Sequence, residues 1–346
     1  MDEVKEFLPW HDSAWKAVLA ARAGGRLPHA LLLHGPKGLG KGRFARQLAA
    51  LCLCEPAPAG PAPCGACRGC RLATAGTHPD LHVIQPEEGK VALSIDQIRE
   101  LSGDLVLLPH LASLKIAIIR PAESMTPSAA NALLKTLEEP AGATLLLLVS
   151  ARPSALPPTV RSRCQVVRFR PPPAALARAW LAERREQERA WDPLLELAGG
   201  APLAALALSE SGAAAHVAEL ERDLQGIVDA KADPLAVATQ WAGEDRELWW
   251  SWLQTRVSAL IRQKTLRENP EAGHSGAARA LPNYARNLKL TALLDYWDTL
   301  LRARPALETM PAAPANEQER RRIEPILDAL LIPWAHGLER PGRTES

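Results

Sequence analysis

The sequence predicts an α/β P-loop domain with a parallel sheet, followed by a small helical domain and a larger all-helical domain. Strand-like runs alternate with helix-like segments up to about residue 170 and then stop, and a glycine-rich GxxxxGK loop follows the first run. Such alternation is typical of a parallel sheet covered by helices. We therefore expect domains over residues 1–170, 171–206 and 207–346.

Five short apolar runs are expected to form the sheet. The most apolar of them do not alternate with polar residues, which is typical of strands buried on both faces. The runs are residues 30–34, 81–85, 115–120, 144–150 and 165–169.

Helix signals lie between and after these runs. Ser94 and Gln97 form a capping-box pattern before residues 95–101. Thr126-Pro127 opens a helix over residues 128–139 that ends at Pro140. Prolines at 171–173 mark a domain boundary. Further on, we expect helices at residues 213–229, 234–243, 247–267 and 288–304, a loop at 269–280, and a weaker helix at 320–336 interrupted by Pro325 and Pro333.

Composition excludes several classes of protein. The 346 residues are 47% hydrophobic and 23% charged, with a net charge of +2, so the chain as a whole is not marked as a nucleic-acid binder. No apolar run reaches the roughly 18 residues of a membrane span. The charged beginning of the sequence is unlike a signal peptide. We expect a cytoplasmic protein without a membrane partner, whose six cysteines are reduced.

The GxxxxGK loop begins at Gly35 and predicts a phosphate site. Gly35, Gly38 and Gly40 let backbone N–H groups wrap a phosphate, and Lys41 neutralises its charge. The next position should carry the Ser or Thr hydroxyl that binds Mg²⁺. That position is Gly42, which has no side chain.

The second half of an ATPase site is also altered. Residues 115–120 should lead into metal-binding acids, but Pro121 stands at the expected aspartate and Glu123 is expected to be a solvated loop carboxylate. Without Mg²⁺ ligands, phosphoryl transfer loses its main charge neutralisation. We expect no ATP hydrolysis, and only weak binding of ATP or ADP through Lys41.

Four cysteines in a C-x9-C-x2-C-x2-C pattern predict a structural zinc module at about residues 52–80. Four thiolates suit a tetrahedral Zn²⁺ and leave no open coordination position. An iron–sulfur cluster is the weaker alternative, because the usual ferredoxin spacing is absent. Cys52 is an alternative to the first ligand, and Cys164 is expected to be an ordinary apolar residue. The expected ligands are Cys54, Cys64, Cys67 and Cys70.

Several motifs together resemble bacterial clamp-loader subunits of the AAA+ class. They are LPHALLLHG at residues 27–35, the four-cysteine insertion, THPD at 77–80, NALLKTLEEP at 131–140 and SRC at 162–164. The resemblance covers residues 27–164. Beyond about residue 206 it rests on length and helical character alone.

Within that class the sequence resembles the delta-prime family more than the gamma/tau ATPase family. An ATPase subunit would carry GKT or GKS and an acidic strand end, whereas this chain has Gly42 and Pro121, and its Leu8-Pro9-Trp10 also resembles delta-prime. Two alternatives stay open at this point. One is an active clamp-loader ATPase, and the other is a stand-alone zinc-containing nucleic-acid binder.

The resemblance implies an arginine finger at Arg163, which would act in trans on the ATP of a neighbouring subunit. Without the resemblance, Arg163 would be interpreted as a surface arginine. The implied partners are gamma/tau and delta subunits, with the sliding clamp and primer–template DNA as part of the complex. The implied architecture is an AAA+ domain, a small helical lid and a helical collar. In the collar, we expect some of Trp249, Trp250 and Trp252 to pack internally and others to meet a partner.

Overall fold

The fold was taken from a computed structural model. It describes residues 7–55, 60–140, 142–185, 191–268, 288–308, 310 and 314–338. The chain forms two compact units, Met1–Leu181 with Gly200–Ala204, and Ala182–Gly199 with Ala205–Ser346. We call them the sheet unit and the helical unit. The three-domain division expected from the sequence stays a prediction, as does the loop at 269–280, which lies outside the described residues.

The sheet unit is built on a parallel sheet of five strands in the order β2-β3-β4-β1-β5. Each strand coincides with an expected run, and three strands end one residue early. This confirms the predicted α/β fold. The strands are β1 (Ala30–His34), β2 (Leu81–Ile84), β3 (Lys115–Ile119), β4 (Thr144–Ser150) and β5 (Gln165–Arg168).

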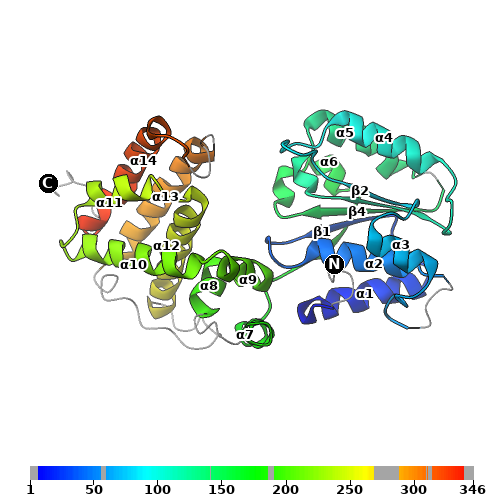
Figure 1. Ribbon diagram of the computed structural model, residues 1–346, viewed down its shortest axis with the longest axis horizontal. Helices are drawn as coiled ribbons and strands as arrows, with labels where there is room; N and C mark the ends of the chain where they lie inside the picture. Colours follow the sequence, from blue (N-terminus) through cyan, green and yellow to red (C-terminus); the bar gives the residue numbers. More distant parts are fainter. Residues whose placement is uncertain are drawn as a thin grey trace. The chain divides into compact units, whose positions relative to one another are not determined.

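Helices cover both faces of this sheet. Figure 1 shows α1, α2 and α3 on one face and α4, α5 and α6 on the other. They are α1 (Asp12–Ala23), α2 (Lys41–Cys52), α3 (Arg68–Ala75), α4 (Ile95–Val106), α5 (Pro127–Glu138) and α6 (Pro158–Arg161), with α7 (Ala174–Ala182) after β5 and short 3₁₀ turns at Pro9–His11, Ala122–Ser124 and Pro153–Ala155.

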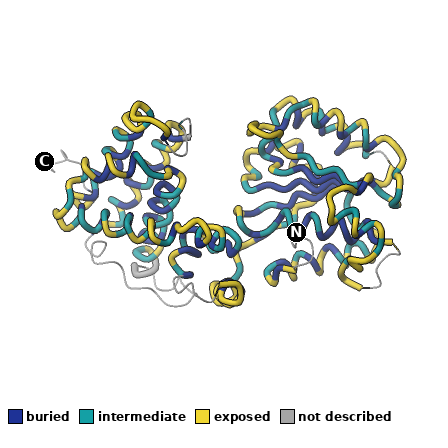
Figure 2. The backbone as a smooth tube through the Cα atoms, viewed as in Figure 1, coloured by how far each residue is buried: buried dark blue, intermediate teal, exposed yellow. Residues whose placement is uncertain are grey.

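Alternate residues of the central strands enter two separate cores. Leu31 and Leu33 of β1 pack with Phe44 of α2, while Ala30 and Leu32 pack in the core beneath α4 and α5. Figure 2 shows the buried strands between these two layers. This two-sided burial explains why the strand runs are apolar throughout.

Local signals in the sequence start the helices as expected. Ser94 and Gln97 form a complete capping box at α4. Thr126 Oγ1 accepts a hydrogen bond from the N–H of Ala129, and Pro127 occupies the first turn of α5. The buried side of α5 then faces the sheet, so its polar side is left exposed.

The helical unit contains the remaining long helices. Its described elements are α8 (Trp191–Leu197), α10 (Ala213–Val228), α11 (Pro234–Trp241), α12 (Arg246–Glu268), α13 (Leu290–Glu308) and α14 (Glu317–Ala335), while α9 (Pro202–Glu210) begins within the sheet unit. No helix among the described residues is both long enough and apolar enough to cross a membrane.

Two expectations about this unit were wrong. The final helix is continuous through Pro325 and Pro333, because its buried apolar side offsets the local penalty of proline. Trp249, Trp250 and Trp252 are all buried. Helix α12 packs against α8, α10 and α13, so more than one of its sides is covered and none of the three indoles is left for a partner.

Asp80 fixes the connection that leads into β3. Its fully buried carboxylate accepts hydrogen bonds from the backbone N–H groups of His110, Leu111 and Ala112 at 2.6–2.9 Å. Burial alone would raise the pKa of Asp80, but these donors outweigh burial and lower the pKa below its usual range. The THPD motif therefore orders this loop.

We predict that Asp80→Asn lowers the free energy of unfolding by about 2–4 kcal/mol at pH 7, because an amide cannot replace a carboxylate on three donors. Because the folded pKa is depressed, this stabilisation exists above the unfolded pKa of about 4 and is lost as pH falls through the folded value. Urea unfolding at pH 7 and pH 3 measures it. A deficit of equal size at both pH values would contradict the role of the charge.

Candidate functional site

The phosphate loop lies where the sequence predicts it, between the end of β1 and the start of α2. Gly40 has φ +78° and is the residue that precedes α2. A Cβ there would lie 2.4 Å from Leu8 Cδ1. Only glycine fits this position, because the backbone angle is left-handed and there is no space for a side chain. The loop thus presents the N-terminus of α2, as a phosphate site requires.

The segment with the Leu8-Pro9-Trp10 signature braces this loop. Trp10 Nε1 donates a hydrogen bond to Leu39 O at 2.9 Å, and His11 Nε2 lies 2.7 Å from the same oxygen. Burial is the main cause that lowers the pKa of His11, to about 4, so its ring is neutral and donates.

Lys41 is turned into its own loop. Its side chain is buried, and Nζ donates to the carbonyl oxygens of Gly35 and Pro36, both at 2.6 Å. Burial lowers the pKa of Lys41 to about 8, although the nearby Glu123 carboxylate opposes that shift. A phosphate would have to draw the ammonium away from two carbonyls.

The guanidinium of Arg120 lies beside Gly42. A Cβ on residue 42 would lie 3.2 Å from an Nη atom of Arg120, so the guanidinium borders the space that a Ser or Thr hydroxyl would use. Pro121 at the position of the metal-binding acid stays a prediction, and the residue just before it, Arg120, is the one whose side chain reaches Gly42. A guanidinium at this point repels Mg²⁺.

A cavity of about 630 Å³ opens beside the loop, lined by both acids and bases. Glu123 is not the solvated carboxylate that we expected. Its Oε1 accepts a hydrogen bond at 2.9 Å from the N–H of Ala151, just after β4. The charged residues of the lining are Lys37, Lys41, Glu88, Arg120 and Glu123.

The four predicted cysteines converge where the segment after α2 meets the first turn of α3. All four Sγ atoms lie within 4.8 Å of one another. The pairs Cys64–Cys70 and Cys54–Cys67 are each 3.9 Å apart, close to the roughly 3.8 Å edge of a tetrahedron with 2.3 Å metal–sulfur bonds. The group has the ligands and the spacing to hold a metal ion.

Backbone N–H groups hold the cysteine sulfurs in place. Cys67 Sγ caps α3 by accepting from the N–H of Cys70, and Cys64 Sγ accepts from the N–H of Cys67, both at 3.3 Å. Such donors favour thiolate over thiol. Gly69 permits the close approach of α3, since a Cβ there would lie 2.2 Å from Leu53 O.

The remaining cysteines take no part in the cluster. Within the described chain, the group contains Cys54 and not Cys52, which answers the alternative that the sequence left open. Burial raises the pKa of Cys52 to about 11, so it stays a thiol. Cys164 is buried in the core under α4 and α5, as expected of an apolar residue.

Arg163 lies on a short turn between α6 and β5. Val160 and Cys164 on either side of it are buried and anchor the turn, while the side chain of Arg163 is 36% exposed. Its guanidinium lies 2.5 Å from Glu138 Oε1 and also donates to Thr159 O at 3.0 Å. Glu138 ends α5, and no pattern in the sequence pointed to this pairing.

Arg163 and the phosphate loop lie at opposite ends of the sheet. Strands β1 and β5 are parallel, and Leu31 pairs with Gln165 in their register. Arg163 comes before β5, and Gly35 comes after β1. At about 3.3 Å per residue, roughly 20 Å of strand separates the two positions.

Comparisons with known proteins place the chain in a family. A family model described as DNA polymerase III, delta subunit, matches residues 10–173. DNA polymerase III subunit delta' of Pseudomonas aeruginosa is 34% identical over 341 residues, covering 97% of this chain and 99% of that protein. The Escherichia coli K12 protein of the same name is 40% identical over 203 residues, covering 58% of this chain and 60% of that one.

Among solved structures, a gamma subunit-related protein of DNA polymerase III from Thermotoga maritima is 18% identical, with a TM-score of 0.44, and covers 95% of this chain and 99% of that chain. The Pseudomonas match carries the assignment, because it extends over nearly the whole of both chains. The chain therefore belongs to the DNA polymerase III subunit delta' family.

Proposed function

We propose that this chain is a non-hydrolysing clamp-loader subunit that supplies Arg163 to the ATP site of a neighbouring gamma/tau subunit. In this proposal it acts in the cytoplasm, assembles with gamma/tau and delta subunits, and helps to load a sliding clamp onto primer–template DNA. The observation that carries the proposal is the separation of Arg163 from the chain's own phosphate loop along the parallel sheet.

The altered metal side of the loop supports the absence of hydrolysis. Phosphoryl transfer in P-loop enzymes needs Mg²⁺ held by a hydroxyl and an acid. Here residue 42 has no side chain and Arg120 lies beside it. Because a fixed guanidinium cannot coordinate the metal or orient the attacking water, we expect ATP or ADP to bind weakly at most, through Lys41 and the loop amides.

The setting of Arg163 supports a role in trans. About 20 Å is beyond the reach of an arginine side chain, so Arg163 cannot serve a nucleotide on its own loop. Its partly exposed guanidinium lies at the surface, where another subunit can reach it. A planar guanidinium suits this task, because it stabilises charge on the transferred phosphoryl group.

In the isolated chain, Glu138 holds the Arg163 side chain in one position through an ion pair. Both side chains of the Arg163–Glu138 pair are partly exposed, and pairs of this kind contribute only about 0–1 kcal/mol. Arg163 can therefore exchange this carboxylate for a phosphate oxygen at low cost. The backbone N–H of Arg163 donates to Val160 O at 3.2 Å, and this bond and the buried side chains of Val160 and Cys164 keep the backbone in place during the exchange.

We also propose that the cysteine cluster holds a structural Zn²⁺. Four sulfur ligands at tetrahedral spacing suit this ion, and they leave no position for water or substrate. The ion would fix the segment between α2 and α3. It has no part in the chemistry of nucleotides.

We predict that Arg163→Ala lowers ATP turnover at the neighbouring site by about 10²–10³, in line with the loss of a charge-stabilising group. Turnover is measured with clamp and primed DNA in a reconstituted complex whose other ATP sites are inactivated. Lys41→Ala should change it less than about twofold, because this loop does not hydrolyse.

Arg161→Ala is the matched control, since Arg161 ends α6 two residues away and should leave turnover unchanged. Turnover that depends on Lys41 and survives Arg163→Ala would contradict the proposal and favour an active ATPase subunit. Tight, salt-sensitive DNA binding by the lone chain would favour the stand-alone nucleic-acid binder instead.

For the metal, we predict one zinc per chain by elemental analysis. Cys67→Ser should weaken zinc binding at least about 100-fold, because it removes one of four ligands, and should lower the melting temperature. Cys52→Ser should keep the metal, since Cys52 lies outside the cluster. The assignment would be wrong if the purified chain contained iron and absorbed visible light. It would also be wrong if the Cys67→Ser variant still bound one zinc per chain.

A further inference from the structure

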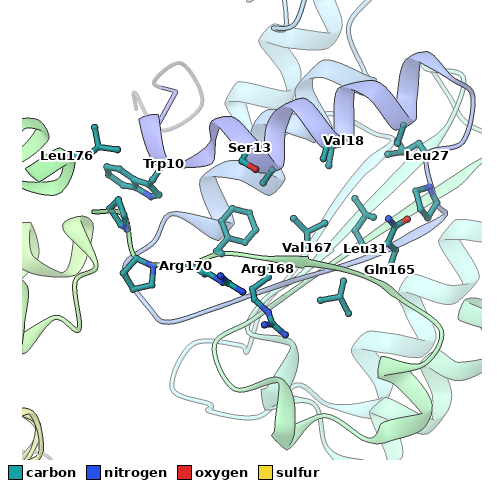
Figure 3. A pocket seen from close by; sticks show the side chains of 18 of the residues that line it. Trp10, Ser13, Val18, Leu27, Leu31, Gln165, Val167, Arg168, Arg170 and Leu176 are labelled. Carbon is teal, nitrogen blue, oxygen red and sulfur yellow. The ribbon is translucent and has the colours of Figure 1, made fainter. Parts of the chain in front are cut away.

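A groove on the sheet unit runs between helix α1 and strand β5, away from the phosphate loop cavity and the cysteine cluster. Its volume is about 590 Å³. Figure 3 shows Ser13, Val18 and Leu27 along one side and Gln165, Val167 and Arg168 along the other. The groove ends at Trp10, the prolines at 171–173 and Leu176.

The side chains of α1 that line the groove are small, and this leaves the groove open. Ser13, Ala14, Ala17 and Ala21 all line the groove. Their spacing places them on one side of the helix. Val18 and Leu31 provide an apolar floor beneath them. An apolar side chain that enters here would meet carbon atoms and would displace water.

Strand β5 forms the other wall and is an edge strand. It pairs with β1 on one side, and the sheet order places no described strand on its other side. Val166 in its middle is 51% exposed. Edge strands are usually blunted by proline, charged side chains or a bulge. Here the prolines begin only at Pro171, and the charged residue within β5 is Arg168 at its end.

The charged residues that line the groove are basic. Arg168 and Arg170 line it, and among the described lining residues there is no acidic side chain. Two β5 strands pairing with each other would bring these arginines together, which disfavours a second copy of this chain as the occupant. An acidic segment would meet complementary charge along the same edge.

We propose that this groove docks an extended, acidic peptide segment of a partner protein, which adds to the sheet as a sixth strand beside β5. Backbone hydrogen bonds along the open edge supply affinity, as in other strand-addition complexes. Alternate apolar side chains enter the groove against α1, and acidic side chains between them face Arg168 and Arg170. The contact spans about six residues, from Gln165 to Arg170, or roughly 20 Å.

The probe is a fluorescein-labelled, acetylated octapeptide of alternating Asp and Val, titrated with the full zinc-loaded chain and followed by anisotropy. Two peptides serve as controls. In one, Lys replaces Asp, and in the other, every second backbone nitrogen is methylated and cannot donate. We expect saturable binding of the first peptide only, weakening as salt rises.

Three protein variants separate the groove from general surface charge. The double variant Arg168→Glu/Arg170→Glu should weaken binding about tenfold or more by reversing the complementary charge. Ala17→Trp should do so by filling the groove, and Ala17 is exposed, so the fold can accept it. Arg99→Glu, a single charge reversal on α4, should leave affinity within about twofold. Zinc content and melting temperature confirm that each variant is folded.

Hydrogen exchange gives a second readout on the same complex. The peptide should slow exchange at β5 amides and leave those of β2, the opposite edge, unchanged. Equal binding of the Lys peptide, unchanged binding by both groove variants, or no binding of the Asp–Val peptide would overturn the proposal. So would dimerisation of the chain through β5, which would make a second copy the occupant.

Discussion

The parallel direction of β1 and β5 is the constraint on which the functional arrangement depends. In a parallel sheet, the residues that follow the strands all lie at one end of the strands, and the residues that precede the strands all lie at the other end. The phosphate loop follows β1, and Arg163 precedes β5. The chain therefore carries its phosphate loop and Arg163 at opposite ends of the sheet, and in the function that we propose the two act together only in different subunits.

The same constraint explains why Arg120 lies beside the phosphate loop. Residues that follow β1, β3 and β4 gather around the loop, so a change at the end of β3 acts directly on residue 42. Arg120 now borders Gly42, while Lys41 and the loop glycines keep the phosphate cradle. The braces from Trp10 and His11 hold the loop in this form. The loop thus retains the outline of a phosphate site, and in our proposal it does not hydrolyse ATP.

Much of the sheet unit could be predicted from the sequence, because its signals are local. Apolar runs, a capping box, the GxxxxGK loop and the cysteine spacing each lie within a few residues of one another. The features that were missed depend on pairings between distant segments. Arg120 meets Gly42, and Glu138 meets Arg163, only through the strand register and the packing of α5 on α6.

In the helical unit, local sequence signals gave predictions that the packing of the helices overturned. Local propensity indicated a break at Pro325 and Pro333, but burial of Leu327, Leu330 and Trp334 keeps α14 continuous. The three tryptophans of α12 could not be assigned from one helix, since the covering helices lie elsewhere in the chain. Tertiary packing overrode local preference in both cases.

Trapping the complete clamp loader on primed DNA with ADP and aluminium fluoride, and determining its structure, would test the central claim most directly. We predict that Arg163 leaves Glu138 and that its guanidinium lies within hydrogen-bonding distance of the fluoride anion in the neighbouring subunit. A structure in which Arg163 stays paired with Glu138, while another group contacts that anion, would contradict the account.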